Sequence, residues 1–398
     1  MQIFLNILLM LVSLSVLICL HELGHLLAAK AFNVYCAEYS LGMGPLILKI
    51  KKPNQETQFS VRVLPVGGYV AMAGEGAEDL EEFKDVPQDR FLNKKPKWQR
   101  AIIMVAGVTV NFILAWVLFI ISGFASPILD SSKRSLIVSE STAETTYLPY
   151  DAGLRSDDVI TNVKFVITAS GLDTLNLQTD ITTGRDLYNA FYMFALNSNV
   201  FGDDVDYTTS NYVNPEDIDA TWEWTLTTEE NKIVTFTLKT SQTTTTTSDG
   251  TKISVNYWNL NDLGLEFHTR NRNFAEAMNR AGQEFVQSFT AFGSLFQPGG
   301  WQNLGGIISV YNASSVAASA GFYNFVFLWG YISLNLAVVN ILPFPGLDGW
   351  HLLVIAIEAI TKKDVPQKLK SIMSAVGLVL LFGLMIFVTV MDIIRLVA

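Results

Sequence analysis

The sequence predicts a polytopic α-helical membrane protein with four transmembrane helices and a β-rich segment inserted between the second and third. Half of its 398 residues are hydrophobic and only 16% are charged, with a mean hydropathy of +0.31. A span needs about 20 mainly apolar residues. Four runs meet this requirement, at about 3–27, 101–124, 321–342 and 371–392.

These runs divide the chain into three parts. The N-terminal membrane half covers residues 1–125, and the C-terminal membrane half covers residues 274–398. Residues 130–270 between them are acidic and Thr-rich and alternate in polarity, which is typical of strands with one exposed face. A length of 398 residues leaves room for this extra domain.

The first apolar run is expected to remain as a span and not to be cleaved as a signal peptide. A signal peptide begins with a positively charged region and has a shorter apolar core. The first basic residue of this chain is Lys30, after the apolar run. Cys19 and Cys36 flank the end of the run and imply no disulfide framework.

Basic residues near the ends of the runs predict the orientation. They lie between the first two runs and between the last two, at Lys49, Lys51, Lys52, Lys94, Lys95, Lys97, Arg100, Lys362, Lys363, Lys368 and Lys370. The positive-inside rule therefore places residues 28–100 and 361–370 in the cytoplasm, and the β-rich part and both termini outside. The net charge of −10 and the lack of a basic stripe argue against a nucleic-acid partner.

The β-rich part contains a clear hairpin signal. "TWEWTLTT" (221–228) and "KIVTFTLKT" (232–240) alternate polar and apolar residues, and "EENK" between them is a turn. "YDAGLRSDDVITNV" (150–163) begins with turn residues and continues as a strand. The Thr-rich tract 240–250 is expected to be a loop.

Two shorter elements are predicted in the membrane halves. Apolar segments around Gly67 and Gly68 predict a β-hairpin within residues 59–74. Residues 274–296 have apolar positions at helical spacing and a polar opposite face. This pattern predicts an interfacial amphipathic helix that leads into the third span.

The end of the first run carries three ionisable residues, His21, Glu22 and His25. On a helix, His-Glu-x-x-His places two imidazoles one turn apart on one face, where both can bind one zinc ion. The glutamate is then free to act as a general base. A coincidental pentapeptide is the alternative, but it would bury three polar side chains in a membrane helix without purpose.

A catalytic zinc usually takes three protein ligands. His268 lies in the β-rich part, across the membrane from His25 in the predicted topology. Asp348 follows the third run, in a Pro- and Gly-rich segment (340–351) that must line a cavity or pack on protein. We therefore expect Asp348 to be the third ligand, and His351 to be a structural histidine.

Taken together, the motifs resemble the site-2 protease family, of the bacterial regulator-of-sigma intramembrane zinc metalloprotease type with a PDZ domain. "HELGH" matches its first motif, and "NILPFPGLDG" (340–349) matches Asn-x-x-Pro-x-Pro-x-Leu-Asp-Gly, whose aspartate is the third zinc ligand. "AGVTVNFILAW" is similar to a second-span motif, Gly-Pro-x-x-Asn. Gly107 and Asn111 are in place there, and Val108 replaces the proline.

Other stretches extend the resemblance. "RVLPVGGYVAMAGE" resembles a membrane-associated β-hairpin of the family, and residues 150–163 are similar to the start of its extracytoplasmic PDZ domain. Residues 165–260 carry acidic and Thr-rich insertions. The resemblance implies a zinc enzyme of the bacterial cytoplasmic (inner) membrane. It would cut single-span membrane proteins within or near their transmembrane segments, in regulated intramembrane proteolysis, for example of anti-sigma factors or signal-peptide remnants.

The substrate helix must unwind before its backbone can be cut. An exposed hairpin edge can replace the lost hydrogen bonds by strand addition, so Gly67, Gly68, Tyr69 and Val70 are expected to bind substrate. Simple packing of the hairpin is the alternative. The resemblance implies that Asn340 bonds the unwound backbone, whereas the alternative is a cap that ends the helix.

Two other classes of protein fit part of the pattern. A transporter or channel also uses broken helices and carboxylates in the membrane, but it predicts inverted repeats and more than four spans. The sequence contains neither. An inactive scaffold that binds proteins through its outer part is also disfavoured, because every expected ligand and the glutamate are present.

Overall fold

The computed structural model describes most of the chain. The described residues are 2–51, 55–75, 83–169, 175–196, 220–239, 241–246, 252–257, 263–294, 297 and 305–397. The chain forms two compact units, Met1–Ser126 with Arg272–Ala398, and Pro127–Asn271. We call them the membrane unit and the β unit. The predicted insertions within 165–260 lie partly outside the described residues.

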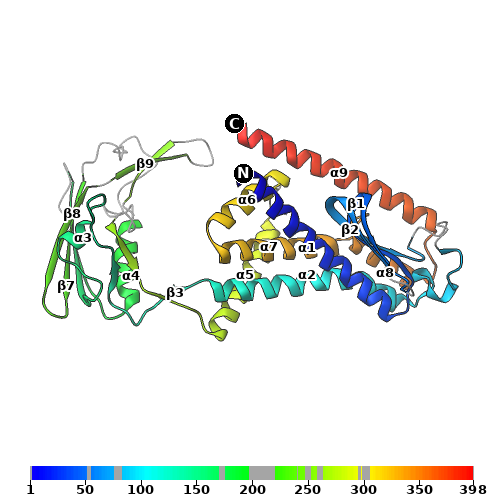
Figure 1. The fold of residues 1–398 in the computed structure, drawn as a ribbon, viewed down its shortest axis with the longest axis horizontal. Coiled ribbons are helices and arrows are strands. Elements are labelled where there is room, and N and C mark those ends of the chain that lie inside the picture. The colour runs from blue at the N-terminus through cyan, green and yellow to red at the C-terminus, as the bar shows by residue number, and fades with distance from the viewer. Residues whose placement is uncertain are drawn as a thin grey trace. The chain divides into compact units, whose positions relative to one another are not determined.

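The membrane unit contains four helices that are long and apolar enough to cross a membrane, which confirms the four predicted spans. They are α1 (Gln2–Ala31), α2 (Lys97–Ala125), α7 (Phe322–Ile341) and α9 (Gln367–Val397). Helix α2 packs on both α1 and α7. Figure 1 shows the end of α1 and the beginnings of α2 and α9 at the same end of the unit, as the predicted topology requires.

Two shorter helices pack beside the spans. Helix α5 (Phe274–Ser294) corresponds to the expected amphipathic helix, and it packs on α2 and α7. Helix α6 (Ile307–Ser319) was not predicted, and it packs on α7 and α1. Asp392 of α9 accepts hydrogen bonds from the backbone N–H groups of Gly306 and Ser309. The carboxylate thus satisfies free donors at the start of α6 and attaches α9 to it.

A β-hairpin connects α1 to the segment before α2. Its strands are β1 (Cys36–Ile50) and β2 (Gln58–Met72). Residues 38–41 of β1 pair with residues 58–61 and also with residues 68–71 of β2. Two short 3-10 turns, at Gln88–Arg90 and Leu92–Lys94, then lead into α2.

This sheet differs from the hairpin predicted within residues 59–74. The two apolar segments on either side of Gly67 are not paired with each other, because the first strand lies between them. The first strand was not predicted because it contains Gly42, Gly44 and Pro45, residues depleted in regular strands. Both glycines have positive φ, 85° and 86°, where the strand changes direction.

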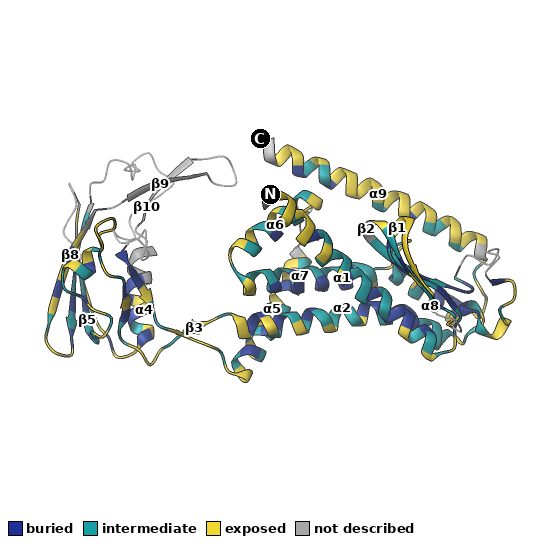
Figure 2. Ribbon diagram, in the orientation of Figure 1, coloured by how far each residue is buried: buried dark blue, intermediate teal, exposed yellow. Residues whose placement is uncertain are grey.

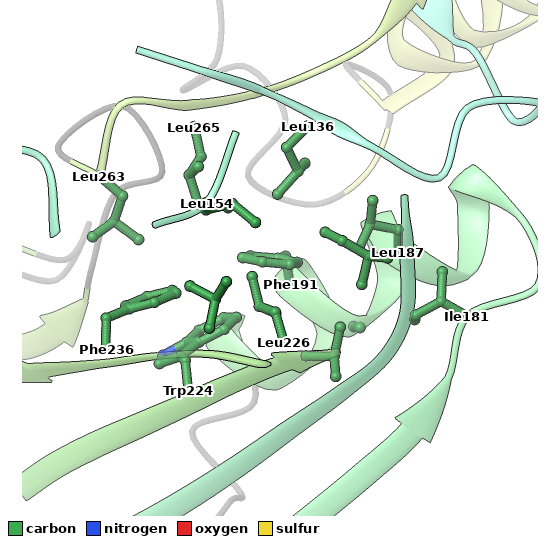
Figure 3. Close-up of a cluster of buried hydrophobic side chains, with 14 of the residues drawn as sticks. Leu136, Leu154, Ile181, Leu187, Phe191, Trp224, Leu226, Phe236, Leu263 and Leu265 are labelled. Carbon is green, nitrogen blue, oxygen red and sulfur yellow. The ribbon is translucent and has the colours of Figure 1, made fainter. Parts of the chain in front are cut away.

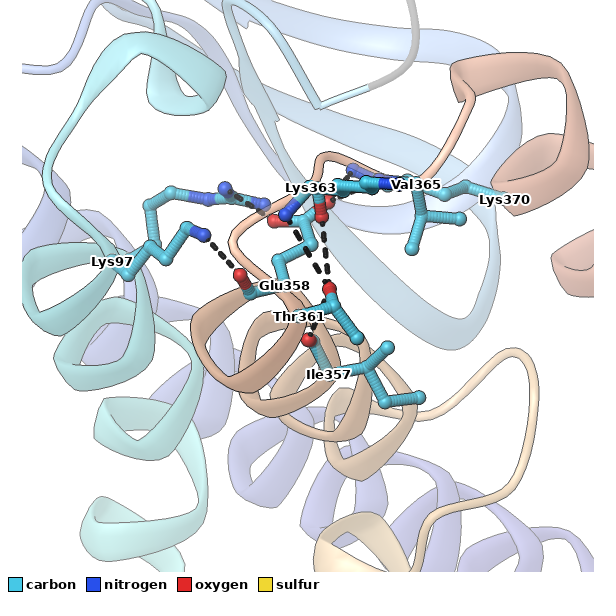
Figure 4. Close-up of polar contacts among 8 residues, drawn as sticks. Lys97, Ile357, Glu358, Thr361, Lys363, Val365 and Lys370 are labelled. Atoms are coloured by element: carbon cyan, nitrogen blue, oxygen red, sulfur yellow. Dashed lines mark hydrogen bonds and ion pairs between the residues drawn. The ribbon is translucent and has the colours of Figure 1, made fainter.

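Helix α8 (Asp348–Thr361) joins the spans α7 and α9 and carries a buried carboxylate, Glu358 (Figure 4). Arg100 and Lys370 donate to this carboxylate at 2.9 and 2.6 Å, and the backbone N–H of Val365 donates at 3.2 Å. Burial alone would raise the pKa of Glu358, but these donors and charges hold it below its ordinary value. One carboxylate therefore ties together α2, α8 and α9.

The β unit is built on a four-stranded antiparallel sheet of order β6-β5-β7-β8. Its strands are β5 (Ile160–Ala169), β6 (Leu175–Asp180), β7 (Ala220–Thr228) and β8 (Ile233–Lys239). Strands β7 and β8 form the hairpin predicted around "EENK". Asn231 turns the chain there, with a positive φ of 60°.

Shorter elements complete the β unit. Helices α3 (Leu148–Asp151) and α4 (Gly184–Leu196) accompany three two-stranded pairs. The pairs are β3 (Ile128–Leu129) with β12 (Thr269–Arg270), β4 (Leu136–Val138) with β11 (Leu265–Phe267), and β9 (Ser241–Thr246) with β10 (Lys252–Tyr257). Part of the Thr-rich tract is therefore a strand and not the predicted loop.

The core of the β unit is apolar and aromatic (Figure 3). Trp224 is fully buried at its centre, with Phe165 and Phe191 at ring-centroid distances of 3.9 and 4.5 Å. Leucines from several elements, including Leu154 and Leu187, surround the rings. Burial of apolar surface in such a core is a main source of folding stability.

Candidate metal centre

Three side chains from two distant segments meet in the membrane unit. The Nε2 atoms of His21 and His25 are 3.2 Å apart, and Oδ2 of Asp348 is 3.1 Å from the first and 3.2 Å from the second. Among the described residues, this is the one group of at least three His, Cys, Asp or Glu side chains with metal-binding geometry. Both histidines are about 95% buried.

The two histidines are held by helix α2. Residues 21 and 25 are one turn apart on α1, so their rings share a face. The ring of His25 lies directly on Gly107, where a Cβ atom would be 2.3 Å from Nε2. Its Nδ1 is 2.8 Å from the carbonyl oxygen of Ile103 and donates to it when protonated. The absence of a side chain at residue 107 thus makes room for the ring.

Asp348 reaches the histidines because the chain turns sharply after α7. That helix ends at Ile341, and α8 begins at Asp348 itself. Gly349 lies so close to the end of α7 that a Cβ atom would be 2.2 Å from the carbonyl oxygens of Ile341 and Leu342. Only glycine fits this approach, and the tight turn fixes Asp348 opposite α1.

The geometry fits a zinc ion. For tetrahedral zinc with bonds of about 2.0–2.1 Å, neighbouring ligand atoms lie roughly 3.3–3.4 Å apart. The three ligand atoms form a triangle with sides of 3.1–3.2 Å. Oδ2 of Asp348 is buried and receives no hydrogen bond from the described residues. A cation held between the three atoms would satisfy it.

Glu22 lies under strand β2. A Cβ atom at Gly68 would be 3.2 Å from Cγ of Glu22 and 2.9 Å from the carbonyl oxygen of Ser40. The strand can therefore lie against the glutamate only because residue 68 has no side chain. On the edge away from β1, residues 68–71 have no strand partner in the described part of the chain.

The other residues expected to bind substrate are held by the hairpin itself. Gly67 has a positive φ of 91° beside the side chain of Met43. Tyr69 donates its hydroxyl to Glu38 at 2.8 Å, and the side chain of Val70 is buried in a core cluster. These two side chains are occupied, so the strand offers its backbone edge for binding.

The remaining sequence candidates lie in three different places. Asn340 is beside the triad, with Nδ2 at 3.4 Å from Nε2 of His21. His351 is outside the triad and lines a cavity of about 220 Å³ together with Glu75 and Arg100. Burial raises the pKa of Glu75 to about 7. His268 belongs to the β unit, where its Nε2 is 3.2 Å from the hydroxyl of Ser135.

Sequence reasoning assigned Asn111 no role beyond its place in a motif. In the structure this residue is fully buried, and its side-chain Nδ2 is 3.2 Å from Nδ1 of His21. A polar residue inside an apolar span was the available signal. Whether its side chain faces His21 depends on how α2 is rotated about its axis when it packs against α1.

Comparison with known proteins gives a consistent picture. A family described as Peptidase family M50 matches residues 9–384. The chain is 28% identical to a Clostridium perfringens protein, over 96% of this chain and 97% of that protein. It is 28% identical to a Nostoc protein (95% and 93%) and 26% identical to a Staphylococcus aureus protein (96% and 96%). Each of the three is named "Putative zinc metalloprotease".

Proposed function

The chain belongs to peptidase family M50 and is a zinc metalloprotease, and from this premise we propose that it cuts single-span membrane proteins within or near their transmembrane segments. Its apolar helices make it an integral membrane protein. The observation that carries the proposal is that His21 and His25, on the apolar helix α1, meet Asp348, which follows the apolar helix α7.

In this proposal the three side chains hold the zinc ion, and Glu22 is the general base. When bound, zinc polarises the scissile carbonyl and lowers the pKa of a water to about 7, which supplies a nucleophile near neutral pH. Glu22 would accept a proton from the attacking water and return it to the leaving amine nitrogen. Both histidines are buried, which limits the access of bulk water to this proton transfer.

Strand β2 is the proposed substrate-binding element. Its 68–71 edge has open backbone groups, and it lies directly over Glu22 through Gly68. A substrate segment that leaves its helix can pair with this edge and recover backbone hydrogen bonds. Asn340, next to His21, is positioned to bond the same segment through its amide.

The proposed orientation puts the basic ends of α2 and α9 in the cytoplasm. Lys97 and Arg100 at the start of α2 and Lys370 at the start of α9 gather around Glu358, at one end of the unit. The positive-inside rule assigns that end to the cytoplasm of a bacterial inner membrane. The β unit and both termini are then extracytoplasmic.

We further propose that the β unit is a PDZ-like filter. It contributes no residue to the triad, and its described core is apolar. A domain that excludes substrates with bulky outer domains needs only a steric penalty against them. The substrates would then be membrane proteins already trimmed outside, such as anti-sigma factors or signal-peptide remnants.

Cleavage of a model substrate in proteoliposomes tests the proposed activity. We expect the zinc-loaded protein to cut a single-span substrate inside its apolar segment, with the cut position read by mass spectrometry. Removal of zinc with a chelator should stop cleavage, and added zinc should restore it. Cuts confined to water-exposed loops of the substrate would contradict the intramembrane assignment.

Removal of the β unit tests the filter separately. A variant that lacks residues 135–268, with a flexible bridge in their place, should keep its zinc and cut the trimmed substrate. It should also cut a substrate that retains a large folded outer domain, which the full chain rejects. If the deletion abolishes cleavage of the trimmed substrate while zinc and folding persist, the β unit recruits substrate and the filter is wrong.

A further inference from the structure

Asn111 lies in the middle of α2 with a side chain that contacts a proposed zinc ligand. It is fully buried, and its backbone oxygen accepts a hydrogen bond from Ser333 of α7 at 3.0 Å. The side-chain nitrogen Nδ2 is 3.2 Å from Nδ1 of His21. The side-chain oxygen Oδ1 is buried and has no hydrogen-bond partner within the described part of the chain.

The geometry of the triad indicates which ring nitrogen of His21 carries the proton. Its Nε2 faces Nε2 of His25 and Oδ2 of Asp348 at 3.1–3.2 Å, so Nε2 must offer a lone pair to the metal. A neutral imidazole then carries its proton on Nδ1. That N–H needs an acceptor, and metal-ligating histidines usually donate their second nitrogen to an oxygen.

If Nδ2 of Asn111 faced this N–H, two hydrogen-bond donors would point at each other and neither would have an acceptor. The two orientations of an asparagine amide have the same shape, and hydrogen bonding alone distinguishes them. Rotation by 180° brings Oδ1 to the position 3.2 Å from Nδ1 of His21. This orientation gives the buried oxygen a donor and the imidazole an acceptor, so it satisfies both groups.

His25 provides an internal comparison. Its Nδ1 is 2.8 Å from the carbonyl oxygen of Ile103, an oxygen that can only accept. The N–H of His25 is therefore fixed on the side away from the metal. Ile103 and Asn111 lie two turns apart on α2, so both histidines of α1 contact polar groups of one helix through Nδ1.

We propose that Asn111 is a positioning residue whose Oδ1 accepts the Nδ1–H of His21 and thereby fixes the tautomer that presents Nε2 to zinc. The inference rests on the proposed ligand set. Helix α2 then contributes to metal binding by orienting a ligand, although it supplies no ligand itself.

Two substitutions at residue 111 distinguish this hydrogen bond from simple packing. Asn111→Asp keeps an acceptor oxygen and should bind zinc at least as tightly as the parent, within about threefold. Asn111→Leu keeps a similar volume without an acceptor and should weaken zinc binding by about 10–100-fold. Zinc affinity is measured by competition with a chromophoric chelator, and folding by circular dichroism and thermal unfolding.

Matched controls separate this inference from the ligand assignment. Ser333→Ala removes the neighbouring bond to the Asn111 backbone and should leave zinc affinity unchanged. His21→Ala should lose zinc if the proposed ligand set is correct, and retained zinc there would overturn that set. If His21→Ala loses zinc but Asn111→Leu keeps parent affinity, only the role of Asn111 is wrong.

The aspartate variant distinguishes best between an oxygen and a nitrogen of residue 111 facing His21. If Nδ2 donated to an unprotonated Nδ1, Asn111→Asp would lose the bond and bind zinc as weakly as Asn111→Leu, which would overturn the proposal. Should the leucine variant not fold, Asn111→Asp decides alone. Zinc affinity within about threefold of the parent supports the acceptor role, and a loss of about 10–100-fold overturns it.

Discussion

The two units bury different kinds of residue. Nearly all buried polar and charged side chains among the described residues belong to the membrane unit, including His21, Asn111, Glu358 and Asp392. In the β unit, Thr228 is the one buried polar residue recorded for the described part of the chain. Figure 2 shows exposed faces along α9, whose side chains are largely apolar.

The surroundings proposed for each unit account for this difference. Apolar burial drives the folding of a water-exposed domain, so the β unit concentrates its aromatic residues inside. Lipid is as apolar as a leucine side chain, so apolar contacts alone distinguish membrane helices poorly. Buried polar side chains of the membrane unit instead form hydrogen bonds and ion pairs between specific helices. The histidines proposed as zinc ligands are also polar side chains buried between helices.

The largest expected effect comes from a single carboxylate of the membrane unit. Glu22→Gln keeps the side-chain volume but removes the proposed base, so cleavage of a single-span substrate should fall by at least ~10²-fold. Zinc content and thermal stability should stay close to those of the parent. Glu284→Gln is the matched control, because Glu284 is another carboxylate of this unit and lies outside the triad. Near-normal cleavage by Glu22→Gln would remove this residue from the mechanism.

The next effect belongs to the β unit and concerns stability alone. Trp224→Ala removes the largest fully buried side chain and should cost about 3–5 kcal/mol of unfolding free energy in this unit. Zinc content should not change, because the triad lies in the other unit. Tryptophan fluorescence and limited proteolysis measure the unfolding, and elemental analysis measures the metal. A loss of zinc in this variant would contradict the independence of the two units.

A smaller change is expected at the buried ion cluster of the membrane unit. Glu358→Gln keeps an oxygen acceptor but removes the charge that faces Arg100 and Lys370, so it should destabilise the unit by about 1–3 kcal/mol. Thermal unfolding in detergent measures the loss. The double variant with Lys370→Met tests coupling. Additive effects of the two substitutions would show that the pair does not hold α8 to α9.

The smallest effect is a pH dependence at the hairpin. Hydrogen bonds from Arg90 and Lys30 lower the pKa of Glu56 to about 2 from 4.5. A carboxyl whose folded pKa is lowered contributes stability that is complete above pH 4.5 and disappears as the pH falls toward 2. The side chain is 38% exposed, so solvent limits the contribution to at most about 1 kcal/mol. The difference in thermal stability between parent and Glu56→Gln should be full at pH 7, shrink below pH 4.5 and vanish only near pH 2; an equal difference at pH 7 and pH 2 would contradict this.

The sequence could reveal the spans and the triad because both depend on local patterns. Long apolar runs identify the four helices, and ionisable residues inside or beside such runs, as at His21 and Asp348, are too costly to be ordinary. Strand β1 escaped prediction because Gly42, Gly44 and Pro45 interrupt its pattern. The contact of Asn111 with His21 depends on how α1 and α2 are rotated, and one asparagine in an apolar run does not contain that information.

The most direct test of the account is the zinc content of purified ligand variants. About one zinc per parent chain is expected. His21→Ala, His25→Ala and Asp348→Ala should each lose most of it, while the controls His351→Ala, from the cavity beside the triad, and His268→Ala, from the β unit, should keep it. Full zinc in Asp348→Ala, or loss of zinc in His351→Ala or His268→Ala, would contradict the proposed metal centre.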